Sequence, residues 1–112
     1  MTVFDVAEKL NLKVLSGQGG MNRVVDGGYV SDLLSDVMGN ANEGQIWITL
    51  QTHKNIMAIA SLKELAAIII VKGLQPSTDC ALQSNNEQIP ILTTDLETFD
   101  ISGKLYKVFN LD

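Results

Sequence analysis

The sequence predicts an α/β fold in which helices flank a mostly parallel β-sheet. Strand-like apolar segments alternate with helix-like segments from residue 44 onward, which is the order of successive β-α units. The run 66–71 (AAIIIV) is continuously apolar, as in a strand buried on both faces of a parallel sheet. The 112 residues, 46% of them hydrophobic, suffice for one core but not for two ordinary domains. We therefore expect one domain over residues 1–112.

The N-terminal segment predicts a short helix, a short strand and a turn. Thr2 and Asp5 have the spacing of a capping box, and apolar residues then recur at helical intervals. Residues 12–15 alternate like a brief strand. The glycine-rich segment 16–20 lacks the Lys-Ser/Thr ending of a phosphate-binding P-loop, so we interpret it as a flexible turn.

The next segment predicts a short extended piece followed by a helix. Val24 and Val25 favour an extended chain, and the apolar residues between 30 and 38 recur at helical spacing. Ser31 or Asp32 is the natural N-cap of this helix. These first 40 residues fit the β-α pattern less regularly, and we expect them to add an edge strand or a cap to the sheet.

The rest of the chain predicts three strands and three helices. The helix expected from Asn55 to Leu65 has little polar circumference, so it needs cover on more than one side. We expect a second copy of the chain to provide part of that cover, which predicts a homodimer. The expected strands lie at residues 46–50, 66–71 and 89–92, and the expected helices at 55–65, 78–87 and 102–109.

Charge and composition exclude several functions. Thirteen acidic and eight basic residues give a net charge of −5, which disfavours nucleic acid and anionic membranes as partners. The single Cys80 and the single His53 form no cluster with metal-ligand spacing, so we predict neither a metal nor a cofactor. No signal-peptide pattern opens the chain, and its longest apolar run is too short to cross a bilayer. We therefore expect a cytoplasmic protein.

The candidate site lies where the parallel strands end. Loops and helix N-termini gather hydrogen-bond donors at the carboxyl ends of such strands, and ligands bind there. Thr52 or Asn55 is open to a plainer interpretation as a helix cap, and Trp47, which with Tyr29 offers a stacking surface, to one as a core residue. The candidate ligand-binding residues are Asp32, Trp47, Thr49, His53, Asn55, Gly73, Thr94 and Asp95.

Several of these segments together resemble a known family, the small stand-alone DRTGG-domain proteins. The resemblance runs from about Gly27 to Leu105 and is most specific between Gly28 and Ala60. It implies an α/β fold similar to the N-terminal domain of HPr kinase/phosphorylase, without kinase activity because no P-loop is present. The segments that carry it are 28–39 (GYVSDLLSDVMG), 47–49 (WIT), His53 with Asn55, 92–95 (LTTD) and 98–99 (TF).

The resemblance also implies a role and shows a departure. DRTGG domains accompany nucleotide-sensing CBS domains in regulated pyrophosphatases, and also occur in phosphotransacetylases, as regulatory, dimer-forming modules. Similar stand-alone proteins are often encoded near iron hydrogenase components, which implies a partner enzyme. Where the family motif places Asp-Arg this chain has Thr52-His53, and where it places Thr-Gly-Gly the chain has Val71-Lys72-Gly73. Only Gly73 keeps the family residue.

Three functional hypotheses follow. The first is a non-enzymatic, homodimeric regulatory module that binds a small ligand such as a nucleotide at the strand ends. The second is a small hydrolase or transferase in which His53 is the general base and Asp32 or Asp95 orients it, which requires these side chains within hydrogen-bond reach. The third is a scaffold that docks on a partner enzyme and binds no small molecule. We favour the first and assign no catalytic residue.

Overall fold

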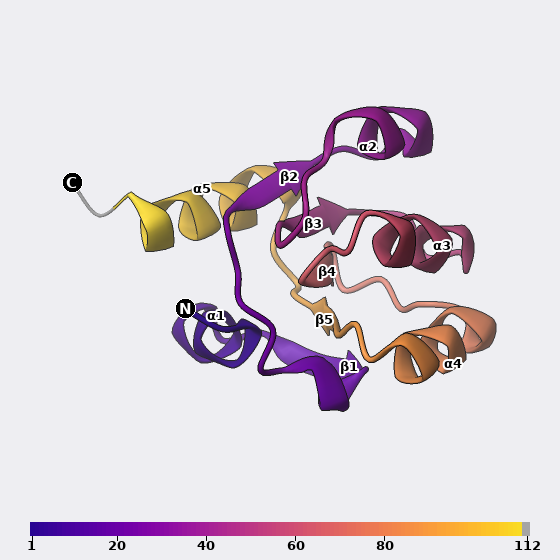
Figure 1. The fold of residues 1–112 in the computed structure, drawn as a ribbon. Helices are drawn as coiled ribbons and strands as arrows, with labels where there is room; N and C mark the ends of the chain where they lie inside the picture. Colours follow the sequence, from indigo (N-terminus) through magenta and orange to yellow (C-terminus); the bar gives the residue numbers. More distant parts are fainter. Residues whose placement is uncertain (111–112) are drawn as a thin grey trace.

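The computed structural model describes residues 1–110, which form a five-stranded sheet between two layers of helices (Figure 1). The strand order is β1-β5-β4-β3-β2, in which β2 to β5 run parallel and the edge strand β1 runs antiparallel to β5. This confirms the predicted mostly parallel sheet and the edge strand expected from the N-terminal residues. The strands are β1 (Lys13–Ser16), β2 (Gly28–Val30), β3 (Ile46–Thr49), β4 (Ala67–Ile70) and β5 (Ile91–Thr93).

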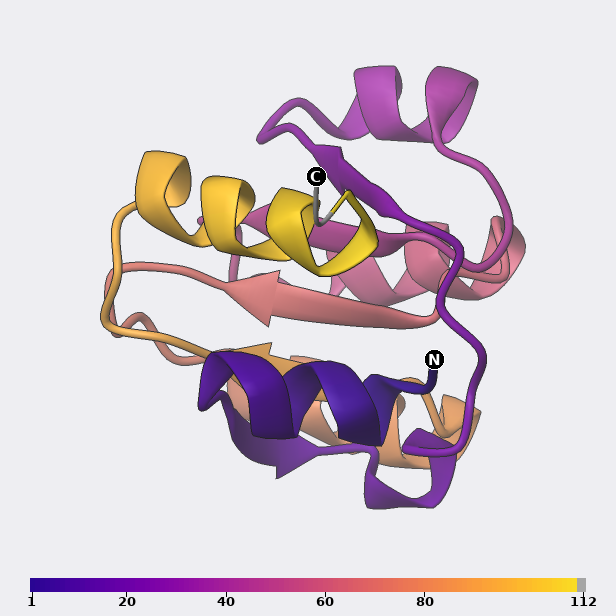
Figure 2. The ribbon, with the colours of Figure 1, turned by 90° about the vertical axis from the view of Figure 1, so that its left-hand side faces the viewer.

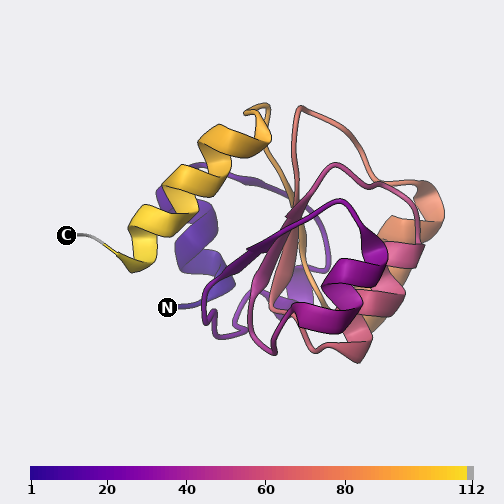
Figure 3. The same cartoon turned by 90° about the horizontal axis from the view of Figure 1, so that it is seen from above.

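The helices are divided unequally between the two faces of the sheet. Seen from above, α2, α3 and α4 lie on one side of the strands, and α1 and α5 lie on the other (Figure 3). Figure 2 shows α1 and α5 side by side across the near face. No helix of residues 1–110 has the length and apolarity needed to cross a membrane. The helices are α1 (Val3–Leu10), α2 (Leu34–Asn40), α3 (Asn55–Leu62), α4 (Thr78–Glu87) and α5 (Thr98–Phe109), with a short 3₁₀ turn at Gln18–Gly20.

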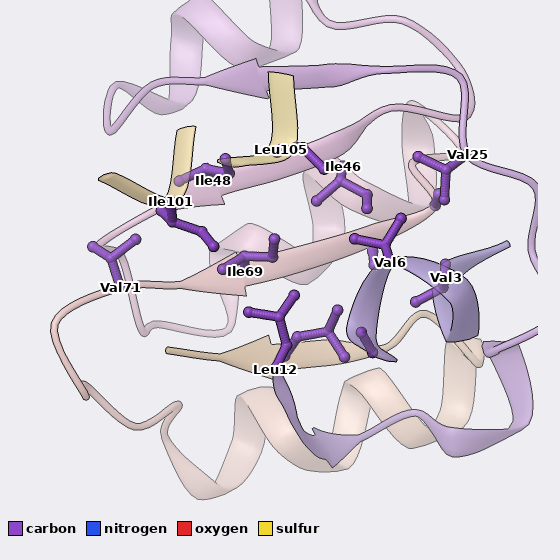
Figure 4. Packing of buried hydrophobic residues seen from close by; sticks show 14 residues of the cluster. Val3, Val6, Leu12, Val25, Ile46, Ile48, Ile69, Val71, Ile101 and Leu105 are labelled. Atoms are coloured by element: carbon purple, nitrogen blue, oxygen red, sulfur yellow. The ribbon is translucent and has the colours of Figure 1, made fainter. Parts of the chain in front are cut away.

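Each face of the sheet has its own apolar core. Alternate residues of a strand point to opposite faces, so Ile46 and Ile48 pack toward α1 and α5 (Figure 4), while Trp47 between them packs toward α3. In the same way Ile69 joins the first core and Ile68 the second. The central strands are buried on both sides, which is why they are continuously apolar.

The predicted capping box opens α1 as expected. The backbone N–H of Thr2 donates to the Asp5 carboxylate (2.9 Å), and the backbone N–H of Asp5 donates to the Thr2 hydroxyl (3.3 Å). The hydrogen bonds that the carboxylate accepts from the backbone N–H and from the hydroxyl (3.1 Å) of Thr2 hold the pKa of Asp5 below its ordinary value of 3.8. Two amides at the start of the helix, which have no partner inside it, are thereby satisfied.

The glycine-rich segment 16–20 is a tightly packed turn rather than a flexible one. The Ser16 hydroxyl donates to the Ser84 hydroxyl (2.8 Å), and both side chains are buried. A Cβ added to Gly20 would lie 1.9 Å from the carbonyl oxygen of Gln88. Gly17 and Gly20 are therefore required because the chain passes against the backbone of the turn between α4 and β5, a contact that local sequence does not reveal.

Three helix boundaries differ from the sequence prediction. Val30 lies in β2 opposite Ile48, so α2 begins only at Leu34, and neither Ser31 nor Asp32 is its N-cap. Parallel pairing with β3 holds residues 28–30 in an extended conformation, although the apolar residues from position 30 onward recur at helical spacing. The next helix, α3, ends at Leu62, before a turn with positive φ at residue 64, and α5 begins at residue 98, one turn earlier than predicted.

The apolar helix α3 is covered largely within the chain itself. Ile56, Met57, Ile59 and Ala60 are buried, and α3 packs between α2 and α4. Of its large apolar side chains, Leu62 stays exposed, at 67%. The two neighbouring helices therefore supply the cover that the sequence analysis assigned to a second copy, and this helix no longer supports the homodimer prediction.

Candidate functional site

The carboxyl ends of the parallel strands meet at one edge of the sheet, and backbone hydrogen bonds join the loops that follow them. The Ser77 amide donates to the carbonyl oxygen of Thr52, and the Gly73 amide donates to that of Thr94, each at 2.9 Å. The structure thus brings the loops after β3, β4 and β5 together, as the topology predicts. The loops after β2, β3, β4 and β5 comprise residues 31–33, 50–54, 71–77 and 94–97.

Asp32 joins the ends of β2 and β3. Its Oδ1 accepts hydrogen bonds from the Thr49 hydroxyl (2.9 Å) and from the Leu50 amide (2.8 Å), while the Gln51 side chain donates to its backbone carbonyl (3.0 Å). The Thr49 side chain is fully buried. Two of the predicted ligand contacts, Asp32 and Thr49, are therefore bonded to each other, and this contact joins adjacent loops.

Trp47 lies in the core and offers no surface for stacking a ligand. Its exposed fraction is 0%, and its indole Nε1–H donates to the carbonyl oxygen of Ser31 (2.8 Å). Half-buried Tyr29 donates its hydroxyl to Asp36 (2.9 Å). This bond raises the pKa of Tyr29, and hydrogen bonds from Ser31 and Tyr29 lower the pKa of Asp36. Both aromatic side chains thus serve to attach the β2–α2 connection.

His53 and Asn55 are exposed at the start of α3. The imidazole Nδ1 of His53 accepts a hydrogen bond from the Asn55 amide (3.3 Å). The structure thus places the histidine at the helix start, and neither Thr52 nor Asn55 caps the helix by its side chain. Among the hydrogen bonds of residues 1–110, His53 has none to Asp32 or Asp95.

The structure explains why position 73, where the chain keeps the residue of the family motif, is a glycine. Its φ is +67°, and an added Cβ would lie 2.9 Å from the Asp95 carboxylate. Glycine alone adopts this conformation without strain and leaves room for the neighbouring side chain. The preceding Lys72 forms an exposed ion pair with Glu97 (3.9 Å). These contacts fix the β4 loop against the β5 loop.

A cleft of about 530 Å³ opens at the carboxyl end of β5. Thr94 and Asp95, two of the predicted residues, line it, together with Lys13 and Lys104, which the sequence analysis did not single out. Lys13 reaches this place because β1 pairs antiparallel with β5 and sets it opposite Thr93. No local motif could have found it, since the pairing spans 80 positions.

The described residues show no group of three or more His, Cys, Asp or Glu side chains placed to hold a metal ion. Asp32 and Asp36, which lie four residues apart, form hydrogen bonds with different parts of the fold. The first bonds to the β3 end, and the second to Tyr29 and to the side chain of Asn40.

Comparison with known proteins identifies a family and similar solved structures. No curated protein matches the chain. A crystal structure of the CBS and DRTGG domains from the regulatory region of Clostridium perfringens pyrophosphatase, complexed with the activator diadenosine tetraphosphate, is similar over 93% of this chain, with a TM-score of 0.70 and 16% sequence identity. The chain spans 45% of the length of that relative. The family model described as the DRTGG domain matches residues 5–108. This chain therefore belongs to the DRTGG domain family.

Proposed function

We propose that residues 1–112 form one regulatory domain that binds a small ligand, such as an adenine nucleotide, at the carboxyl ends of the strands and acts through a partner enzyme. The main support is the likeness of nearly the whole chain to part of a regulatory region that binds a nucleotide activator. The loops at this edge supply exposed polar side chains beside a cleft. The free thiol of Cys80 suits a reducing compartment such as the cytoplasm.

The geometry favours binding over catalysis. A hydrolase or transferase that uses His53 as general base needs a carboxylate to orient the imidazole. The one hydrogen bond of the His53 side chain in the described structure comes from the Asn55 backbone, and Asp32 is engaged with Thr49 and Leu50. We therefore assign no catalytic role to these residues.

We propose further that the module is a homodimer formed at the β2 edge. Within residues 1–110, β2 pairs only with β3, so its outer edge has backbone groups free for another chain. Val30 (48% exposed) and Tyr106 (68% exposed) line an apolar groove between β2 and α5. Light scattering tests this: a dimer in the native chain and a monomer in Tyr106→Glu are expected, and a monomeric native chain contradicts it.

Thermal denaturation with added ligands tests the sensing function. The chain is heated alone and with AMP, ADP, ATP or diadenosine tetraphosphate, and calorimetry measures the Kd of any ligand that raises Tm. A ligand at about 100 times its Kd stabilises the folded state by about 2.7 kcal/mol. A rise in Tm with at least one nucleotide supports a sensor. An unchanged Tm with all of them refutes the nucleotide proposal and favours a scaffold that binds no small molecule.

A further inference from the structure

We propose that the ligand carries a phosphate group and binds in the cleft at the carboxyl end of β5, where Lys13 and Lys104 hold the phosphate. This inference rests on the proposed sensing function and deepens it, since it selects one part of the sheet edge and one class of ligand. We call the cleft the β5 cleft and define it by six of its polar lining residues, Asn11, Lys13, Gln75, Thr94, Asp95 and Lys104.

The course of the chain places a crevice at this point. After β2, β3 and β4 the chain turns to the same face of the sheet, where α2, α3 and α4 lie. After β5 it turns to the opposite face and enters α5 (Figure 3). The loops after the neighbouring strands β4 and β5 are joined by backbone hydrogen bonds at the strand ends, from Gly73 to Thr94 and from Lys72 to Leu96, but they lead to helices on opposite faces of the sheet. Ligands of open α/β sheets bind where the connections of adjacent strands change sides in this way. The β5 cleft contains residues of both loops, Gln75 from one and Asp95 from the other.

The charges of the β5 cleft suit an anion, although the chain as a whole is acidic. Lys13 and Lys104 are exposed, and the ion pair found within residues 1–110 involves neither of them. Asp95 is the one acidic residue lining the cleft, so the lining carries a net charge of +1 at pH 7. Two lysines that line one cleft, Lys13 from β1 and Lys104 from α5, supply point charges of the kind that bind phosphate.

A cavity of similar size at the opposite edge of the sheet has the reverse charge. Its volume is about 500 Å³, and it lies where β3, β4 and β5 begin. Four carboxylates and one guanidinium line it, from Asp26, Glu43, Glu64, Glu87 and Arg23. A phosphate group is repelled there and attracted to the β5 cleft, so charge selects between two cavities that volume alone does not distinguish.

The remaining polar side chains that line the β5 cleft indicate which other groups the ligand carries beside its phosphate. The Thr94 oxygen accepts a hydrogen bond from the Leu96 amide (3.2 Å), which leaves its hydroxyl hydrogen free to donate. The exposed Asp95 carboxylate accepts from donors such as sugar hydroxyls, and Asn11 and Gln75 supply amides. A volume of about 530 Å³ holds a small metabolite. The ligand class is a phosphorylated sugar, either free or as part of a nucleotide.

Titration of the isotope-labelled full chain with AMP, glucose 6-phosphate and adenosine tests this assignment. Amide shifts locate each probe, and calorimetry gives its Kd at low and high NaCl. We expect AMP, glucose 6-phosphate or both to shift residues of the β5 cleft and to bind more weakly at high salt, whereas adenosine binds far more weakly. Lys13→Ala and Lys104→Ala should each raise Kd about tenfold. The matched control Lys107→Ala removes the same charge from α5 outside the cleft and should leave Kd unchanged.

The outcomes separate this inference from the proposed nucleotide sensing. Binding of glucose 6-phosphate alone in the β5 cleft upholds the site and refutes the nucleotide. Binding of AMP with shifts confined to the region of Asp32 and His53, and with equal Kd in all three lysine variants, overturns the site and leaves nucleotide sensing intact. Adenosine binding as tightly as AMP overturns the phosphate assignment. Failure of every probe to bind overturns the site. The three lysines are exposed, so we expect their replacement to leave Tm unchanged. Measuring Tm of each variant checks that it is folded.

Discussion

Replacing Asp32 by Ala tests whether this carboxylate stabilises the contact between the ends of β2 and β3 or serves to bind a ligand. The substitution removes the acceptor of two hydrogen bonds, from the Thr49 hydroxyl and the Leu50 amide. The Thr49 side chain is fully buried, so its donor finds no water, and a buried donor left without a partner costs about 1–3 kcal/mol. The Leu50 amide is near solvent and adds little. We expect the free energy of unfolding to fall by about 1–3 kcal/mol.

Urea denaturation followed by the fluorescence of buried Trp47 measures this change. Asp32→Asn is the matched control, because it keeps Oδ1 as an acceptor, and it should stay within about 0.5 kcal/mol of the native chain. In a chain that already carries Thr49→Val, Asp32→Ala should lower the free energy of unfolding by about 1 kcal/mol less than it does in the native chain, because the Thr49 hydroxyl that would lose its acceptor is absent. Unchanged stability of Asp32→Ala, combined with loss of ligand binding, would refute the structural role and restore Asp32 as a ligand contact.

Three further changes test other parts of the fold. Gly20→Ala should lower the free energy of unfolding by at least about 1–3 kcal/mol in urea denaturation, because its Cβ would lie 1.9 Å from the Gln88 carbonyl oxygen; Gly19→Ala, whose Cβ meets a flexible side chain at 3.1 Å, should cost less. Asp5 has a lowered pKa, so its contribution to stability is present above pH 3.8 and lost as the pH falls below it; Asp5→Asn should make stability less dependent on pH in that acidic range. Burial raises the pKa of Cys80 to about 11, so its thiol should react with Ellman's reagent at pH 8 only as fast as the chain opens.

Each of these tests has a contrary result. Equal stability of the two glycine variants would contradict the close packing of the turn at residues 16–20. An unchanged pH dependence in Asp5→Asn would show that the capping box does not bind the carboxylate form preferentially. Rapid modification of Cys80 in the native chain would contradict the burial of its side chain on the core-facing side of α4.

The elements that the sequence predicts well are those whose signals are local. The capping box of α1 needs only Thr2 and Asp5, three positions apart. The continuously apolar run 66–71 contains β4 because burial on both faces leaves no polar position. Helix α4 occupies the predicted residues 78–87, between a capping serine and a residue with positive φ. In each case the residues that carry the signal also make the contacts.

The predictions that fail depend on contacts between distant segments. Pairing of Val30 with Ile48 delays the start of α2, which the helical spacing of the segment could not show. Helix α3 packs against both α2 and α4 and is largely covered by them. The apolar surface that α3 leaves exposed is therefore smaller than its sequence suggests. The sequence likewise could not show that Thr49 donates a hydrogen bond to Asp32 and so joins the ends of two strands. Each outcome was decided by a partner elsewhere in the chain.

The sequence by itself determined the α/β class, the family and the edge of the sheet that concerns function, because β-α alternation fixes where parallel strands end. Only the tertiary structure decided which residues at that edge remain available. Asp32 and Trp47 are engaged or buried, whereas Lys13 and Lys104 converge on the β5 cleft from opposite ends of the chain. The physical reason is that strand order, direction and helix side are set by long-range packing, which brings together charges that no local pattern relates.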